Sequence, residues 1–128
     1  MDKKTNQKFL TDVERAVIEG GATEPPFSGE YDDFYKEGTY VCRRCENPLF
    51  SSAAKFKSGC GWPSFDEEFK GSVKRLPDDD GPRTEIICAK CGAHLGHVFT
   101  GEEMTSKNTR HCVNSLSIKF VSKNNTKR

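Results

Sequence analysis

Long hydrophobic runs are absent from this sequence of 128 residues, and no stretch approaches the roughly 20 apolar residues that cross a bilayer. An excess of one charge is also absent, because 20 lysine and arginine residues nearly cancel 19 aspartate and glutamate residues. Proteins that bind nucleic acids or anionic membranes are distinctly basic, so we expect neither partner. The polar first eight residues lead into no apolar segment, so we expect no signal peptide.

Apolar residues are scarce as well, at 34% of the sequence with a mean hydropathy of −0.74. They predict one domain over residues 1–128, with a thin core that a metal, disulfides or a partner would support. Frayed polar tails are expected at 1–8 and 123–128. Without an export signal we expect a cytoplasmic location, where cysteines are more often metal ligands or catalysts than disulfides. The sequence also lacks a glycine-rich phosphate loop, which argues against a bound nicotinamide or flavin.

The pattern of residues predicts a mainly β fold with a short N-terminal helical extension. Thr11 and Glu14 fit a capping box, apolar residues recur at helical spacing from Leu10 to Val17, and Gly20–Gly21 ends the helix. A proline-containing loop follows at 23–29. The clearest strands, separated by turns such as the one at 78–82, are predicted at 38–41, 83–87 and 115–121.

Four of the six cysteines form two C-x-x-C pairs, Cys42 with Cys45 and Cys88 with Cys91. Each such turn aims two thiolates at one point, and two turns complete the tetrahedron that a structural zinc ion prefers. A thioredoxin-like redox pair or two disulfides are the alternatives. A redox pair is typical of a βαβ unit, which the sequence does not show.

Cys60 lies in the segment Ser58–Phe65, in which two glycines and a proline predict a tight, irregular loop. The same loop holds Trp62, the only tryptophan. A buried cysteine with a core tryptophan is one interpretation. A tryptophan in a glycine- and proline-rich loop is more typical of a surface pocket.

Cys112 precedes the strand predicted at 115–121. Alternation along one continuous strand places Asn114, Cys112 and Arg110 on the same face as the apolar residues of that strand. A positive neighbour lowers a cysteine pKa from its usual value of about 8.5, and an asparagine can donate a hydrogen bond to the thiolate. The pattern favours a reactive Cys112 over an inert buried one. His94 and His97 could be metal ligands or acid–base groups, and their spacing alone leaves both open.

Together these residues make the chain resemble the type B methionine sulfoxide reductases, the peptide-methionine (R)-S-oxide reductases. The resemblance runs from about Leu10 to Phe120. Its motifs are Thr23–Phe27, the two C-x-x-C pairs, Lys55–Phe65, Arg83–Glu85, His94–Phe99 and Arg110–Ser115. It implies a fold of two antiparallel sheets, of the β-tent or Mss4-like kind, with a four-cysteine zinc knuckle away from the active site.

The resemblance also implies a role for each candidate residue. Cys112 would be the nucleophile and Cys60 the resolving cysteine, while Trp62 would cap the pocket for the S-methyl group. The residues expected to line the site and to steady the thiolate or polarise the sulfoxide oxygen are His94, His97, Asn114 and Arg110. His111 replaces the family's usual aromatic residue before the nucleophile, and Glu102 stands where an Asp-Gly-Pro run is common, so the roles of both stay open.

The implied reaction is the thiol-dependent reduction of protein-bound or free methionine-R-sulfoxide to methionine, a repair of oxidised proteins. It would pass through a cysteine sulfenic acid and an intramolecular disulfide, which thioredoxin or a similar dithiol would recycle. The rival interpretation is a zinc-ribbon module that binds protein or nucleic acid without catalysis. That interpretation assigns no functional role to five of the residues above, which are Cys60, Trp62, His97, Arg110 and Cys112.

Overall fold

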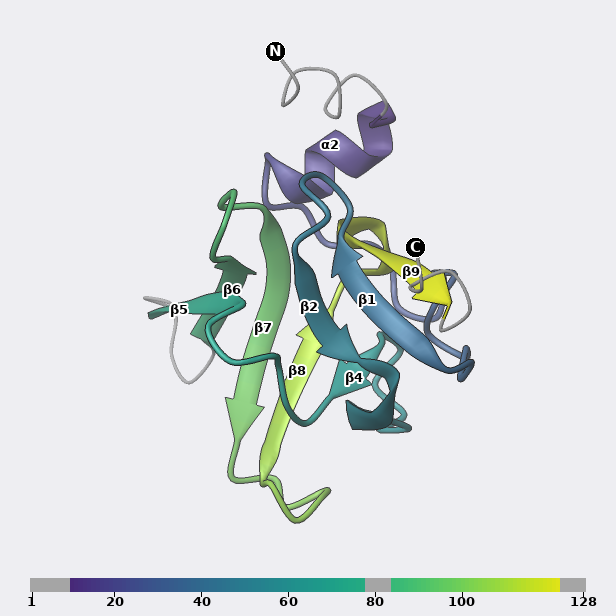
Figure 1. The fold of residues 1–128 in the computed structure, drawn as a ribbon, viewed down its shortest axis with the longest axis vertical. Helices are drawn as coiled ribbons and strands as arrows, with labels where there is room; N and C mark the ends of the chain where they lie inside the picture. Colours follow the sequence, from purple (N-terminus) through teal and green to yellow (C-terminus); the bar gives the residue numbers. More distant parts are fainter. Residues whose placement is uncertain (1–9, 78–83, 123–128) are drawn as a thin grey trace.

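The computed structural model describes residues 10–77 and 84–122, and Figure 1 shows a short helix beside two β-sheets. The tails expected at 1–8 and 123–128, the turn at 78–82 and Arg83 lie outside the described residues. The elements are α2 (Asp12–Ile18), β1 (Gly38–Cys42), β2 (Pro48–Ser51), the 3₁₀ turn η1 (Ser52–Ala54), β3 (Lys55–Phe56), β4 (Ser64–Phe65), β5 (Val73–Pro77), β6 (Thr84–Cys88), β7 (His94–Thr100), β8 (Thr109–Val113), the 3₁₀ turn η2 (Ser115–Ser117) and β9 (Ile118–Ser122). Within the described ranges, no helix has the length and hydropathy needed to span a membrane.

The helix α2 begins at the capping box that the sequence predicts. The Glu14 N–H donates to Thr11 Oγ1 at 3.1 Å, and the Thr11 N–H donates to Glu14 Oε1 at 2.9 Å. The buried face differs from the simple apolar stripe, because Val17 and Ile18 are buried whereas Val13 is 62% exposed. The buried apolar side chains of the helix therefore lie in its C-terminal turn, while Glu14 near its start pairs with Arg43 at 3.4 Å.

The strands form two antiparallel sheets, which confirms the predicted fold class. A three-stranded sheet has the order β2-β1-β9, and a six-stranded sheet has the order β3-β4-β8-β7-β6-β5. Aromatic rings join the two sheets: Phe50 on β2 stacks on Phe65 on β4 with ring centroids 4.4 Å apart. Tyr40 on β1 meets Phe65 edge-on at 5.1 Å. The core therefore lies between the sheets, and the far face of the larger sheet is left for a site.

The chain between residues 110 and 121 differs from the single strand that the sequence predicts. Strand β8 ends at Val113 in the six-stranded sheet, η2 turns the chain, and β9 begins at Ile118 in the three-stranded sheet. The extrapolation of one strand face from Phe120 back to Cys112 is therefore wrong. The polar residues Asn114, Ser115 and Ser117, all buried, form hydrogen bonds at this turn rather than continuing a ladder.

Candidate active site

Cys112 lies on the face of β8 that points away from the core. It stands directly opposite His97 on β7 and Ser64 on β4. Directly opposed residues of antiparallel strands project to the same side of a sheet. The flanking side chains His111 and Val113 project to the other side and are only 1% and 0% exposed. Cys112, His97 and Ser64 thus share the outer face of the six-stranded sheet.

A bulge in β7 brings His94 onto the same face. Residues three apart in a regular strand project to opposite faces, so His94 and His97 would ordinarily separate. Here the register between β6 and β7 shifts. Glu85 pairs with His97, and Ile87 pairs with His94, so two steps along β6 correspond to three steps along β7. Since Glu85 and Ile87 share a face, both imidazoles come to the face of Cys112, with ring centroids 5.9 Å apart.

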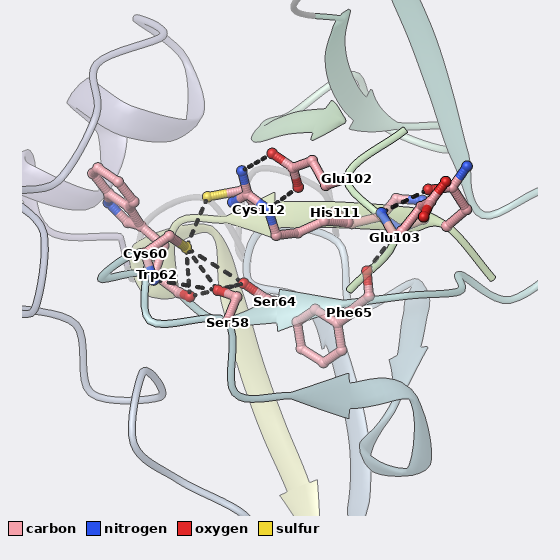
Figure 2. A network of polar contacts seen from close by, with 11 residues as sticks. Ser58, Cys60, Trp62, Ser64, Phe65, Glu102, Glu103, His111 and Cys112 are labelled. Carbon is pink, nitrogen blue, oxygen red and sulfur yellow. Dashed lines mark hydrogen bonds and ion pairs between the residues drawn. The ribbon is translucent and has the colours of Figure 1, made fainter. Parts of the chain in front are cut away.

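The loop of Cys60 places its thiol beside Cys112, as Figure 2 shows. The two Sγ atoms are 3.8 Å apart, although 52 residues separate the cysteines. The Ser58 hydroxyl donates to Cys60 Sγ at 3.1 Å, and Ser64 Oγ lies 3.4 Å from it. The thiols are thus adjacent without a large movement of the loop.

Gly61 contributes close packing rather than freedom of movement. It has a φ of +98°, and a Cβ there would lie 2.6 Å from Pro26 Cβ. Its carbonyl accepts the Phe27 N–H at 2.7 Å. Gly61 therefore allows the Cys60 loop to pack closely against the segment of Pro26 and Phe27.

The two thiols ionise as an unequal pair. The Cys112 thiol, followed by the hydroxyls of Ser58 and Ser64, lowers the pKa of Cys60 to about 4. The same contact with Cys60, reinforced by burial, raises the pKa of Cys112, against which Arg110 acts in the opposite direction. In the reduced pair the neighbouring Cys60 thus opposes the depressed pKa predicted for Cys112, and the one negative charge belongs to the coupled pair.

Arg110 reaches the thiol pair from the same strand face, and Glu102 holds it there. Its Nε and Nη2 atoms donate to the two carboxylate oxygens of Glu102 at 2.8 and 3.0 Å. Its guanidinium carbon also lies 4.4 Å from the centroid of the Phe99 ring. This fork fixes the plane of the guanidinium while its charge stabilises a thiolate on Cys112. Glu102 is thereby placed as the partner of Arg110.

A cavity of about 110 Å³ opens at Cys112. Its wall combines one indole ring, one phenyl ring and several polar groups, contributed by Thr23, Trp62, Gly96, His97, Phe99, Cys112 and Asn114. Gly96 allows this arrangement, because a Cβ at that position would lie 2.0 Å from the Cys112 carbonyl oxygen. The cavity has room for a small group such as a thioether methyl, with a nucleophilic sulfur and an imidazole at its wall.

Glu24, which the sequence marks only as part of a motif, organises two of these wall residues. Its carboxylate is 3% exposed and accepts the N–H groups of Ser115 and Leu116 at 2.8 and 3.1 Å. Its own N–H donates to Asn114 Oδ1 at 3.0 Å, and its carbonyl accepts the Trp62 indole N–H at 2.9 Å. Burial raises the pKa of the Glu24 carboxyl, although these N–H donors oppose the change.

Asn114 is committed mainly to the backbone rather than to the thiol. Besides accepting from Glu24, its Nδ2 group donates to the Leu95 carbonyl at 3.1 Å. An amide nitrogen carries two hydrogens, so one remains for the cavity that Asn114 lines. The predicted hydrogen bond to the Cys112 thiolate stays a prediction.

The remaining two histidines differ in environment. His94 Nδ1 lies 2.8 Å from Glu85 Oε2, and its buried Nε2 has no hydrogen-bond partner among the described residues. His111 lies in the core, where its Nδ1–H donates to the Phe65 carbonyl at 3.0 Å and its Nε2 lies 2.8 Å from Glu68. Strand alternation thus turns His111 away from Cys112.

The other four cysteines converge at a second place. Two turns of the same shape bring their four sulfurs within 4.8 Å of one another, from Cys42, Cys45, Cys88 and Cys91. In each turn the residue after the second cysteine, Glu46 or Gly92, has a positive φ, of 66° or 81°. That residue donates its N–H to the carbonyl of the first cysteine at 2.8 Å. One turn follows β1 and the other follows β6, so the cluster links the two sheets.

Comparison with known proteins decides the family. The family model described as the SelR domain matches residues 10–122. Peptide methionine sulfoxide reductase MsrB of Teredinibacter turnerae is 50% identical over 120 residues, which cover 91% of this chain and 87% of that protein. This chain belongs to the type B methionine sulfoxide reductases.

Plant members of this reductase family match at similar levels. The chloroplastic peptide methionine sulfoxide reductase B3 of Oryza sativa is 57% identical over 116 residues, or 90% of this chain, which spans about half (51%) of that relative. Among solved structures, the "Yippee-like" domain of Mis18 has a TM-score of 0.52 at 14% identity, covering 68% of this chain and 97% of that domain. The likeness to the Mis18 domain shows the fold alone.

Proposed function

We propose that this chain reduces methionine-R-sulfoxide to methionine. The sulfoxide can be a residue of an oxidised protein or the free amino acid. The observation that supports this most directly is the distance of 3.8 Å between Cys60 Sγ and Cys112 Sγ at the mouth of a small cavity. Its walls suit the substrate, since Trp62 and Phe99 offer apolar contact to a methyl group. His97 offers a proton to the sulfoxide oxygen.

In the first step the Cys112 thiolate attacks the electrophilic sulfur of the sulfoxide. The attack forms a sulfur–sulfur bond, and a proton from His97 goes to the sulfoxide oxygen. The hydroxyl then transfers to Cys112 Sγ while the substrate's sulfur–oxygen bond and the sulfur–sulfur bond break, so that methionine leaves and Cys112 becomes a sulfenic acid. The reactive form carries the single charge of the coupled pair on Cys112, with the remaining proton on Cys60 across the 3.8 Å contact. Arg110 favours that form.

In the second step Cys60 attacks the Cys112 sulfenic acid, and water leaves as a disulfide forms. The balance is one sulfoxide and two thiols converted to one thioether, one disulfide and one water molecule. The sulfurs need only shorten their separation from 3.8 Å to the bond length of about 2.05 Å. Thioredoxin or a similar dithiol then reduces the disulfide by exchange.

The four-cysteine cluster supports a structural zinc ion. Tetrahedral zinc with sulfur ligands at about 2.3 Å places the sulfurs about 3.8 Å apart. The Cys42–Cys91 and Cys45–Cys88 sulfur separations are both 3.6 Å, so the residues fit the ion. Bound there, zinc would hold the two sheets together, while the cysteines of the reaction are a separate pair.

A cytoplasmic location and the absence of nucleic-acid partners remain part of this proposal. The near-neutral charge supports the second expectation. One relative is named as chloroplastic, so a reducing plastid is the alternative compartment.

The test of the reaction uses both sulfoxide epimers, with dithiothreitol or thioredoxin as reductant. Cys112→Ser should abolish reduction. Cys60→Ser should still form one methionine per chain, lose turnover with thioredoxin, and keep part of its turnover with dithiothreitol. Full thioredoxin-dependent turnover in Cys60→Ser would contradict the resolving role. Equal rates for both epimers would contradict the proposed stereochemistry.

Variants of the cavity wall separate binding from proton transfer. Trp62→Ala should raise KM, because the indole buries the methyl group. His97→Asn should act mainly on kcat, by about 10²–10⁴-fold, because it removes the proton donor. Unchanged kinetics in both variants would assign these residues to packing alone.

A further inference from the structure

A second and larger cavity adjoins Trp62. Its volume is about 250 Å³, and Trp62 belongs to its lining as well as to that of the cavity at Cys112. We propose that this second cavity binds a lysine or arginine side chain of the oxidised polypeptide, within two positions of the methionine sulfoxide. This inference rests on the proposed function, because it names the polypeptide sequence that the same site prefers.

The lining of the cavity suits a side chain that is apolar along its stem and positive at its end. Four aromatic rings, two neighbouring carboxylates and one lysine belong to the wall, together with residues of the Cys60 loop; the aromatic and charged residues are Phe27, Tyr35, Phe56, Trp62, Asp32, Asp33 and Lys57. Lysine and arginine lay their methylene groups on apolar surface while the charged end seeks a carboxylate or an aromatic face. A purely aliphatic side chain would leave the two carboxylates without a partner from the substrate.

The molecule already contains one such contact. Lys55 Nζ lies 3.9 Å from the centroid of the Tyr35 ring and donates to the Asp32 carbonyl at 3.1 Å. The ring therefore accepts a cation on one face. Burial lowers the pKa of Lys55 to about 8, so this lysine still carries its positive charge at neutral pH and holds it against the Tyr35 ring.

The charges around the cavity favour a cation. The cations are Lys55 and Lys57, and the anions are Asp32, Asp33 and, once ionised, Cys60. Burial, with a smaller contribution from the Cys60 anion, raises the pKa of Asp32. The lining itself carries two carboxylates and one lysine, Lys57, and a basic substrate side chain would reduce this local excess of negative charge.

Phe27 presents an unusual aromatic surface at this cavity. Its side chain is 70% exposed, and its backbone has a φ of +64°, in the left-handed region that bulky residues rarely occupy. The hydrogen bond from its N–H to the Gly61 carbonyl fastens it to the loop that carries Cys60. An exposed ring is thus kept beside the thiol pair, where a substrate chain would cover it.

The shared wall sets the distance between the two bound side chains. In an extended peptide, side chains two residues apart project to the same side and are separated by roughly 6.6 Å. A peptide that crosses Trp62 can therefore place the sulfoxide in one cavity and the basic side chain in the other.

The test compares peptides of one length that carry methionine sulfoxide with lysine, leucine or glutamate two positions before or after it. Dithiothreitol is the reductant, so docking of a protein reductant does not contribute. N-acetyl methionine sulfoxide, which has no neighbouring residues, is the reference. The wild-type kcat/KM, divided by that of the reference, should be roughly fivefold higher for the lysine peptide than for the glutamate peptide, mainly through KM.

Charge variants make the inference specific. Asp33→Lys should reverse the preference toward the glutamate peptide, and Lys57→Met should strengthen the preference for lysine. Phe27→Ala should weaken it without reversing it. A lysine-to-glutamate ratio that stays the same in all three variants would overturn the inference, as would a wild-type preference for leucine over lysine.

Two other results have separate meanings. An effect of the three variants that is seen only with thioredoxin as reductant would overturn the inference and assign the cavity to reductant docking. Failure of the wild-type protein to reduce the N-acetyl reference would instead contradict the proposed function itself.

Discussion

The thiol of Cys112 lies 3.8 Å from that of Cys60, and the larger part of the rise in the Cys112 pKa comes from this neighbour. Two thiols so close cannot both ionise easily, and the low pKa of one requires a high pKa of the other. The reduced pair therefore loses one proton much more readily than the second, and its single negative charge belongs to the two sulfurs together.

Removing Cys60 should lower the pKa of Cys112. In Cys60→Ser the competing anion is gone, while burial still raises the pKa and Arg110 still lowers it. The pH midpoint of Cys112 alkylation, followed by mass spectrometry of the modified peptide, should move to lower pH than in the wild type. Arg110→Met in the same background should move it back up. An unchanged or higher midpoint in Cys60→Ser would show that Cys60 does not govern this ionisation.

Loss of one cysteine of the four-thiol cluster should destabilise the whole fold. Cys88→Ser leaves three ligands, and structural zinc sites contribute on the order of 10 kcal/mol to small domains. We expect a lower Tm, lower solubility and less than one zinc ion per chain by native mass spectrometry. Cys60→Ser, outside the cluster, is the control and should retain zinc. A wild-type chain that is metal-free, folded and active would refute the structural zinc.

Replacing Glu46 by glycine should stabilise the protein by about 1 kcal/mol, because its φ of 66° is strained for a residue with a Cβ. The structurally matching position in the other turn is already glycine, Gly92. Denaturant unfolding of Glu46→Gly measures the gain. The variant also loses the solvent-exposed ion pair between Glu46 and Lys119, at 2.6 Å. Lys119→Ala measures how much this ion pair alone contributes to the unfolding free energy. A less stable Glu46→Gly, after this correction, would mean that the strain is not significant.

Acid should destabilise the protein through His111. Burial, opposed by the Phe65 carbonyl and Glu68, lowers the pKa of His111 below its usual 6.5. The unfolded chain then takes up the proton first, so stability is complete above about pH 6.5 and falls as pH drops from there to the lower folded pKa. His111→Phe keeps a ring against Phe50 and should flatten this slope, measured as unfolding free energy between pH 7.5 and 5. An equally steep slope in the variant would assign it to other groups.

Glu24→Gln should cost about 1–3 kcal/mol of stability, because one of two buried backbone N–H groups loses its acceptor. The exposed acid Glu30, in the same loop, provides the matched control Glu30→Gln. Since the Glu24 backbone also holds Trp62 and Asn114, KM for the sulfoxide should rise more than kcat falls. Wild-type stability and KM in Glu24→Gln would limit this residue to a surface role.

The sequence was sufficient for the family, the fold class and the division of the cysteines into a cluster of four and a separate pair, because short motifs carry these. It was insufficient for how the site is built. The face on which Cys112 lies was inferred from one continuous strand. The structure divides that strand into β8 and β9, because the chain changes sheets after Asn114. The cluster of Asn114, Ser115 and Ser117 was the available signal for that turn.

Two further features depend on distant contacts that no local pattern reports. The bulge in β7 reverses the expected facing of His94 relative to His97, and only the pairing with β6 reveals it. The exchange of charge between Cys60 and Cys112 depends on 52 residues of intervening chain folding so that two sulfurs meet. Likewise, Glu24 forms hydrogen bonds with residues that lie 90 to 92 positions further along the chain, which are Asn114, Ser115 and Leu116.

The two cysteine turns follow strands of different sheets, and this has a consequence for descent. A metal held by four thiolates across two sheets is lost when either turn loses its sulfurs, and the surviving pair then confers no cross-link. Once one pair is lost, natural selection no longer maintains the cysteines of the other pair. Lineages that abandon the metal should therefore discard all four cysteines together and replace the cross-link by larger apolar contacts between β1 and β6, with intermediates of two cysteines rare.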